Sequence, residues 1–308
     1  MEAAVIRLED TSGGAIASAI AAERRRIGVG STGMVLTLLI VADESTQADA
    51  TQAAVRAARA HPMRIVTLVP RPDSRQTRLD AQILVGGEDG PGEVAVLRLR
   101  GALSQHANSV AIPLLLPDTP IVAFWPAACP ERPAEDSLGR HAQRRITDAA
   151  AATDPLARLR AEQVHYIPGD TDLSWARLTP WRSLLAAILD EPTPPITGAR
   201  VGAEHGNPSA LLLAIWLQDC LSIAVDLDWG VGPGMTHVAL HTRDGDIAID
   251  RPDGGTATLR RPGAPDALVS LARRDLAALL AEELRRLDPD DIYARTLSHL
   301  PIRDGGPS

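Results

Sequence analysis

The stretch Leu114–Trp125 constrains the fold of this 308-residue chain more than any other. It reads Leu-Leu-Leu-Pro-Asp-Thr-Pro-Ile-Val-Ala-Phe-Trp, with two prolines around a tight corner. Proline fixes its own φ and keeps the preceding residue out of helical geometry, so one element must end at this corner and another must begin. The short apolar run that follows, bounded by Pro126, predicts a buried strand. Trp125 would lie at the carboxyl edge of that strand, where open α/β sheets usually meet ligands and partners.

Other apolar patterns surround this corner. Met34–Ala42 is a continuous apolar run and predicts a buried strand, followed by an Ala-rich helix and a second strand over Arg64–Val69. This is a βαβ unit, so its strands should be parallel. Leu79–Val85 and Val94–Leu99 alternate around a Gly-rich loop and predict a hairpin. The sequence therefore predicts an N-terminal α/β domain with a mixed sheet over residues 31–165.

Residues 1–30 are expected to form a helical arm with a Gly-rich hinge. The hinge, Gly28-Val-Gly30-Ser-Thr-Gly33, matches the dinucleotide pattern G-x-G-x-x-G. That pattern binds pyrophosphate only where it follows a strand and opens a helix, and here it precedes a predicted strand. We therefore expect a hinge here and no nucleotide.

Residues 166–308 predict a second α/β domain with an antiparallel meander and closing helices. Asn207-Pro208 is a helix start, with a capping residue followed by proline in the first turn. Asp244-Gly245 and Asp253-Gly254-Gly255 are turn signals between the strands of the meander. An amphipathic closing helix is predicted from leucines at helical spacing: Leu268, Leu276, Leu279, Leu280, Leu284 and Leu287. The predicted fold class is α/β (α+β), with two domains that are each a mixed β-sheet packed with helices.

Composition limits the compartment and the partners. No apolar run approaches the roughly 18–20 residues that span a bilayer, and the acidic N-terminus is unlike a secretory signal. The two cysteines, Cys129 and Cys220, do not indicate a disulfide framework. We therefore expect a cytoplasmic protein without a membrane partner.

All 31 basic residues are arginines. Reactions that need a Schiff-base lysine, a P-loop lysine or a kinase lysine are thereby excluded. The net charge is −8 and the arginines are scattered along the chain, which argues against nucleic acid as a partner.

No catalytic or metal-binding signature emerges. His237 and His241 are four residues apart on a predicted strand, roughly 13 Å along the chain, too far for one tetrahedral ion. The chain has neither a nucleophile elbow nor a P-loop. Asp170 and Asp172 could form an acid/base pair, but they suit turn and capping roles equally well. We predict no catalytic residue, no metal and no cofactor.

Two arginine-containing motifs are candidates for binding. Arg144-Arg145 precedes Thr147-Asp148 and could bind an anion through bidentate hydrogen bonds, or could pair with carboxylates of this acidic chain. Farther along, Trp175 and Trp181 flank Arg177 near a predicted helix start. Tryptophan and arginine dominate protein interfaces, although the two indoles could instead lock the domains together.

Four motifs, in order, resemble one known family. They are Leu116-Pro-Asp-Thr-Pro-Ile-Val-Ala-Phe-Trp-Pro126, Arg144-Arg-Ile-Thr-Asp148, Pro168-Gly-Asp-Thr-Asp-Leu-Ser-Trp-Ala-Arg-Leu-Thr-Pro-Trp-Arg182 and Gly206-Asn-Pro-Ser-Ala-Leu-Leu-Leu-Ala214. Together they resemble the OpcA family, the glucose-6-phosphate dehydrogenase assembly proteins of actinobacteria and cyanobacteria, and the chain looks like the actinobacterial type. Phe124 departs from the pattern, because a second tryptophan is expected there.

The resemblance implies a non-catalytic protein that binds glucose-6-phosphate dehydrogenase and promotes its assembly or activity, raising flux into the oxidative pentose phosphate pathway and the supply of NADPH. The docking residues are our own hypothesis, drawn from the Trp/Arg clusters: Trp125, Trp175, Arg177 and Trp181.

An alternative from another class is a sugar-phosphate- or nucleotide-binding enzyme. Its candidate residues would be Arg144, Arg145, Asp170 and Asp172. A third possibility is that Trp175 and Trp181 serve only to hold the domains together.

Overall fold

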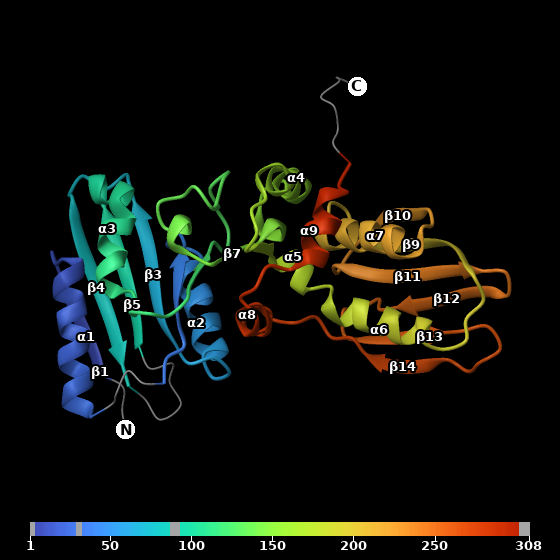
Figure 1. The fold of residues 1–308 in the computed structure, drawn as a ribbon, viewed down its shortest axis with the longest axis horizontal. Coiled ribbons are helices and arrows are strands. Elements are labelled where there is room, and N and C mark those ends of the chain that lie inside the picture. Colours follow the sequence, from blue (N-terminus) through green and yellow to red (C-terminus); the bar gives the residue numbers. More distant parts are fainter. Residues whose placement is uncertain (1–3, 29–32, 87–92, 302–308) are drawn as a thin grey trace, which may run out of the picture. The chain divides into compact units, whose positions relative to one another are not determined.

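The computed structural model describes residues 4–28, 33–86 and 93–301, and the chain divides into two compact units (Figure 1). The N-terminal unit comprises Met1–Asp148, Ile167–Thr171 and Asp275–Pro289. The C-terminal unit comprises Ala149–Tyr166, Asp172–Arg274 and Asp290–Ser308. Each unit therefore contains segments that are distant in sequence.

The described part of the N-terminal unit carries an eight-stranded mixed sheet of order β1-β4-β5-β3-β2-β6-β7-β8. Its strands are β1 (Ala4–Leu8), β2 (Leu36–Val41), β3 (Met63–Arg71), β4 (Arg78–Val85), β5 (Glu93–Arg100), β6 (Ile121–Phe124), β7 (Arg144–Thr147) and β8 (Asp170–Asp172). β5, β3, β2, β6 and β7 run parallel, whereas β4 is antiparallel to both β5 and β1.

Helices cover both faces of this sheet. They are α1 (Gly13–Ile27), α2 (Gln47–Ala57), α3 (Ala107–Ala111) and α8 (Leu276–Arg285), with short 3₁₀ turns η1 (Gly101–His106), η2 (Ile112–Leu114) and η3 (Gly139–His141). Ile16 of α1 packs in one core with Val66 of β3. The neighbouring Thr67 has its hydroxyl 2.7 Å from that of Thr51 on α2. Since successive strand residues point to opposite faces, α1 lies on one face of the sheet and α2 on the other (Figure 1).

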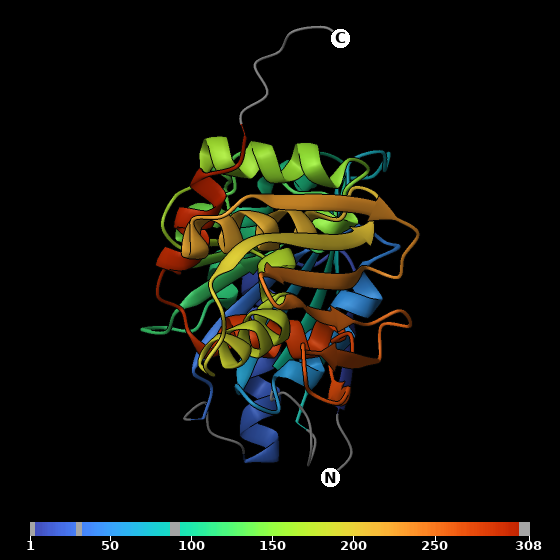
Figure 2. The same ribbon diagram turned by 90° about the vertical axis from the view of Figure 1, so that its right-hand side faces the viewer.

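The described part of the C-terminal unit has a six-stranded sheet of order β10-β9-β11-β12-β13-β14 (Figure 2, yellow to orange-red). Its strands are β9 (Ile196–Glu204), β10 (Val225–Gly230), β11 (Met235–Thr242), β12 (Gly245–Asp250), β13 (Thr256–Arg260) and β14 (Ala267–Ser270). Only the β9–β10 pair among them is parallel. The helices are α4 (Pro155–His165), α5 (Leu173–Ala176), α6 (Thr179–Leu189), α7 (Pro208–Leu221) and α9 (Asp291–Ser298), with the 3₁₀ turn η4 (Ala149–Ala151).

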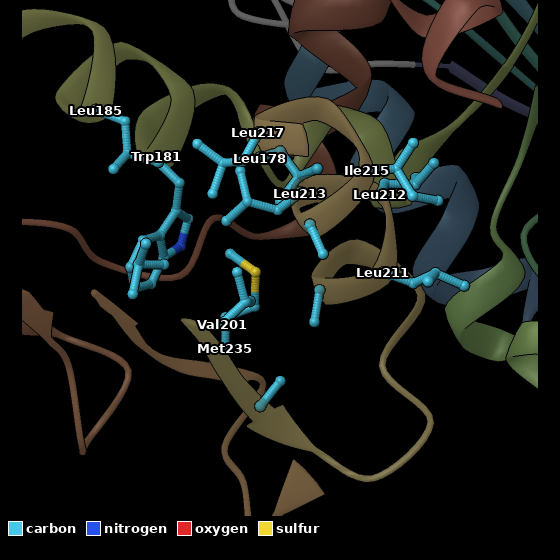
Figure 3. Packing of buried hydrophobic residues seen from close by; sticks show 14 of the residues in the cluster. Leu178, Trp181, Leu185, Val201, Leu211, Leu212, Leu213, Ile215, Leu217 and Met235 are labelled. Atoms are coloured by element: carbon cyan, nitrogen blue, oxygen red, sulfur yellow. The ribbon is translucent and has the colours of Figure 1, made fainter. Parts of the chain in front are cut away.

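The core of the C-terminal unit is built around α7. This helix is apolar on nearly all sides and is capped by Asn207, whose side chain accepts a hydrogen bond from Ala210 N. A helix that is apolar all round must be buried. In Figure 3, Leu213 and Leu217 lie on the side of α7 toward Trp181 of α6, and Val201 of β9 and Met235 of β11 belong to the same core.

The structure confirms the predicted fold class of two mixed sheets with helices, and it differs at the N-terminus. Residues 1–30 were expected to form an arm, but β1 pairs along its whole length with β4, and α1 buries Ile16 and Ile20 in the core of the N-terminal unit. The expected hinge falls partly on residues 29–32, which lie outside the described residues. Ser12 caps α1 by accepting a hydrogen bond from Ala15 N.

A second difference concerns the closing helix, which was predicted to lie in the C-terminal domain and to include Leu268. Leu268 is instead 80% exposed in the edge strand β14, and α8 begins at Leu276 behind the capping residue Asp275. α8 packs on α2 within the N-terminal unit, where Arg56 forms an ion pair of 2.9 Å with Asp275. Leucine spacing predicts the buried face of a helix but does not identify the sheet that this face meets.

None of the described helices is long and apolar enough to cross a membrane.

Candidate functional site

Trp175 anchors the first turn of the C-terminal unit's α5. Asp172 caps this helix by accepting a hydrogen bond from Ser174 N. The indole Nε1 donates to Asp290 Oδ2 at 2.8 Å, and the Arg182 guanidinium carbon lies 3.7 Å from the ring centroid. The opposite carboxylate oxygen of Asp290 caps α9. Trp175 is 2% exposed, so it joins α5, α6 and α9 from the inside.

Trp181 lies on α6 and is 1% exposed. The guanidinium carbon of Arg251 lies 4.9 Å from its ring centroid, close enough for a cation–π contact. Arg251 also donates from Nη1 to Leu271 O and from Nη2 to Met235 O, each at 2.8 Å. This arginine therefore ties the start of β11 to the segment after β14, beneath the Trp181 ring.

Trp125 belongs to the N-terminal unit, where it follows β6. It packs with Ala123 and Ala142, and its backbone N–H donates to Ile146 O at 3.0 Å. A Cβ on Gly139 would stand 3.1 Å from the far edge of the indole and 1.8 Å from Pro133 O. The loop after Trp125 thus closes over the ring, and only glycine fits at position 139.

These positions bear on the predicted partner surface. Trp125, Trp175 and Trp181 are all buried, and the contacts described above lie within one unit for each of them. Arg177 is half-buried and lines a cavity beside Trp181. The indoles could influence a partner only through the surface that they support, and their role in binding stays a prediction.

Arg144 and Arg145 lie on β7, a strand that the sequence analysis did not predict. Arg144 is ion-paired with Glu283 and also donates to Asp288 O at 2.9 Å. Arg145 is ion-paired with Asp170 and donates to Ala142 O and Pro168 O at 2.7 and 2.9 Å. Of the two interpretations left open, this geometry matches pairing with the chain's own carboxylates. Anion binding by these residues would require breaking the pairs, and it stays a prediction.

Asp170 and Asp172 organise backbone in the same region. Asp170 Oδ2 accepts from Ile167 N at 2.9 Å, and Asp172 Oδ2 accepts from Ala149 N at 2.7 Å. Gly169 has φ +99°, and a Cβ there would stand 2.4 Å from Gln143 O, so the loop approaches β7 closely. Both carboxylates therefore act as the turn and capping residues that the sequence allowed.

The C-terminal unit contains a partly open cavity of about 80 Å³. Four arginines line it, and its walls include Trp181 and the amino end of α7: Arg177, Arg251, Arg273, Arg274, Trp181, Asn207 and Ser209. Of this group, the sequence identified Arg177 and Trp181 as candidates for binding and Asn207 only as a helix cap. The other arginines come from segments far along the chain, and the pair Arg273-Arg274 was the only local signal for them.

Comparison with protein families decides the affiliation of the chain. Residues 54–163 match the profile of the glucose-6-phosphate dehydrogenase subunit N-terminal domain, and residues 168–297 match that of the C-terminal domain. The chain belongs to the OpcA family. The resemblance drawn from the four motifs is thereby confirmed at the level of the family, and the two matches cover most of both units.

No curated protein matches the sequence. Among solved structures, a 3-ketoreductase from Actinomadura kijaniata in complex with NADP and TDP-benzene is similar at 11% identity and TM-score 0.49, covering 86% of this chain and 94% of that one. A UDP-N-acetylglucosamine 3-dehydrogenase from Acidithiobacillus ferrooxidans is similar at 12% identity and TM-score 0.40, covering 86% and 95%. An NAD-binding oxidoreductase from Klebsiella pneumoniae is similar at 9% identity and TM-score 0.41, covering 86% and 94%.

Proposed function

We propose that this protein is a non-catalytic subunit that binds glucose-6-phosphate dehydrogenase and promotes its active form in the oxidative pentose phosphate pathway. The observation that carries this conclusion is the match of both family domains, in order, at residues 54–163 and 168–297. Membership of a family of dehydrogenase subunits also agrees with the predicted absence of an enzymatic role. We further propose that the protein is of the actinobacterial type and works in the cytoplasm.

The alternative function was an enzyme that binds a sugar phosphate or a nucleotide through four residues, and the geometry of these residues favours a structural role. The two arginines hold backbone carbonyls and carboxylates, and the two aspartates accept backbone N–H groups: Arg144, Arg145, Asp170 and Asp172. A general acid or base must reach a substrate proton, and an anion-binding guanidinium must offer donors to the ligand. Here these groups serve the fold.

A non-catalytic subunit can activate an enzyme only by binding its active conformation or assembly more tightly than other states. We place the docking surface on the C-terminal unit, where Arg177 follows α5 and precedes α6. Trp175 and Trp181 support this surface from below. Trp125 supports the loop after β6 in the N-terminal unit in the same way.

The test is the rate of the cognate dehydrogenase across substrate concentrations, with increasing amounts of the purified protein. We expect kcat to rise or the apparent KM to fall, with saturation at a fixed ratio of the two proteins and co-elution on size exclusion. An unchanged rate at saturating protein, without co-elution, would refute the proposal.

Substitutions then test the placement of the surface. Arg177→Gln should weaken activation, measured as a higher concentration of protein at half-maximal effect. Arg243→Gln is the matched control, because Arg243 is a highly exposed arginine of the same unit, on the β11–β12 turn. Equal activation by both variants and the unmodified protein would move the docking surface elsewhere while leaving the activator function intact.

A further inference from the structure

The charge around the C-terminal cavity is one-sided. Four arginines line it, and none of its lining residues among those that the structure describes is acidic. The whole chain has 39 acidic residues against 31 arginines, so a cavity whose described lining holds arginines and no acidic residue runs against its composition. Such clusters attract anions, since neighbouring cations repel one another until a negative charge joins them.

Arg251 is the decisive residue of this cavity. It is 5% exposed, and its hydrogen-bond acceptors are the neutral carbonyls of Leu271 and Met235. Its Nε has no hydrogen-bond partner within the described residues. Burial, followed by repulsion from Arg273, lowers its pKa to about 10, against a weaker opposing attraction from Asp253. Because a buried charge that is held by neutral carbonyls, with no ion pair among the described residues, is unfavourable, Arg251 favours the arrival of an anion.

Arg273 reaches the cavity over two glycines. A Cβ on Gly254 would stand 2.9 Å from Arg273 Cδ, and a Cβ on Gly234 would stand 3.7 Å from its guanidinium carbon. Both glycines have positive φ, +74° and +66°. Neither glycine has a side chain that would crowd Arg273, which is exposed and lines the cavity.

The amino end of α7 adds a further positive potential. Asn207 and Ser209 both line the cavity, at the cap and in the first turn of this 14-residue helix. The backbone N–H groups and the dipole at a helix N-terminus stabilise negative charge. The amino end of α7 and the four arginines therefore all make the electrostatic potential in this cavity more positive.

We propose that this cavity binds a phosphate group, either as inorganic phosphate or as the phosphate of a small monoester. Guanidinium groups from several directions suit a tetrahedral, doubly charged oxyanion. The volume of about 80 Å³ admits such a group, and it is well below the roughly 300–1,000 Å³ of pockets that enclose larger ligands. The site goes beyond the proposed function, because binding to the dehydrogenase involves no small-molecule ligand of this chain.

The experiment is isothermal titration of the full-length protein with three probes: inorganic phosphate, glucose 6-phosphate and neutral glucose. We expect saturable binding of both phosphates at one site per chain, weakening as salt rises, and none of glucose. Tighter binding of glucose 6-phosphate would identify a monoester as the ligand, and equal or weaker binding would identify free phosphate. The absence of saturable binding by either phosphate would overturn the proposal.

Two pairs of variants locate the site. Arg273→Gln should weaken phosphate binding about tenfold or more, the loss expected for one charge-assisted hydrogen bond, whereas Arg243→Gln should leave it unchanged. Ala272→Glu places a carboxylate at the exposed rim and should abolish binding, whereas Ala272→Gln, of the same size, should not. Circular dichroism and thermal melting confirm that each variant is folded. Phosphate binding that is unaffected by both Arg273→Gln and Ala272→Glu would overturn the proposal.

Discussion

Buried arginines have opposite surroundings in the two units. In the N-terminal unit, Arg64, Arg144 and Arg145 are each ion-paired with a carboxylate, from Glu93, Glu283 and Asp170. In the C-terminal unit, Arg251 is buried to the same degree, yet it donates to two carbonyls and lies beside other arginines. Burial alone therefore does not distinguish a structural arginine from a binding arginine, whereas the charge of its partner does.

The difference follows from electrostatics. A guanidinium buried with its carboxylate is already neutralised, and a ligand anion would have to compete with a partner held in place by the fold. A guanidinium held by carbonyls is positioned without being neutralised, so it gains more from a ligand anion. The paired arginines of the N-terminal unit thus stabilise it, and Arg251 is available for binding.

The largest effect should come from removing a carboxylate of the N-terminal unit. Glu283→Ala leaves Arg144 charged and buried, so we expect a loss of about 3–5 kcal/mol in the free energy of unfolding, measured by urea denaturation. Glu135→Ala removes the partner of the exposed Arg132, and it should change the free energy of unfolding by less than about 1 kcal/mol. The double variant Arg144→Met/Glu283→Leu should recover most of the loss. If Glu283→Ala and Glu135→Ala both lowered the free energy of unfolding by the same small amount, the paired arginines of the N-terminal unit would not be structural.

A smaller loss of stability should come from changing Trp175, the indole that donates a hydrogen bond to a carboxylate in the C-terminal unit. Trp175→Phe keeps an aromatic ring but removes the donor to Asp290 Oδ2, so we expect a loss of about 1.5–3 kcal/mol, the range for a hydrogen bond to a charged group. The thermal midpoint should fall accordingly. The matched variant Trp181→Phe keeps the ring that stacks on Arg251 and should weaken packing alone. An unchanged stability of Trp175→Phe would mean that Asp290 is adequately satisfied by capping α9.

The smallest effect should come from Asp80, which pairs with one arginine on β4 and one on β5 of the N-terminal sheet. Desolvation opposes ionisation of Asp80, but hydrogen bonds from Arg100 and Asp10 N and the charge of Arg78 outweigh it, so its pKa lies below the ordinary value. A depressed folded-state pKa stabilises the protein above the unfolded-state value of about 3.9, and this contribution is lost as the pH falls through the folded-state pKa.

Asp80→Asn should therefore lower the free energy of unfolding by about 0.5–1 kcal/mol at neutral pH, and it should change nothing at a pH well below the folded-state pKa. The measurement is urea denaturation of both proteins across that range. A difference that persists in strong acid would show that shape, and not charge, holds these arginines.

Much of the fold was predictable because local patterns determine it. The apolar runs predicted β2, β3 and β6, and the βαβ pattern predicted the parallel pairing of β2 with β3. The turn signals predicted the meander of the C-terminal unit. β7 was missed because its two arginines make the segment polar by sequence. Their partners, Glu283 and Asp170, lie 139 and 25 residues away and neutralise them only in the folded chain.

The candidate site was less predictable than the fold. The tryptophans were recognised as unusual, but a sequence does not show that Trp175 meets Asp290 after 115 further residues. The cavity draws Arg177, Arg251 and Arg273 from three separate segments, and only tertiary packing brings them together. The solvent exposure of the tryptophans was predicted least well, because large aromatic side chains occur both in protein cores and at interfaces.

The most direct measurement is a phosphate titration of the full-length protein, followed by NMR of the arginine Nε–Hε signals. The account predicts that the signals of Arg251 and Arg273 shift in a saturable manner, while those of Arg144 and Arg145 stay in place because their carboxylates hold them. Shifts at Arg144 and Arg145, or no saturable shift at Arg251, would contradict the distinction between the two kinds of buried arginine.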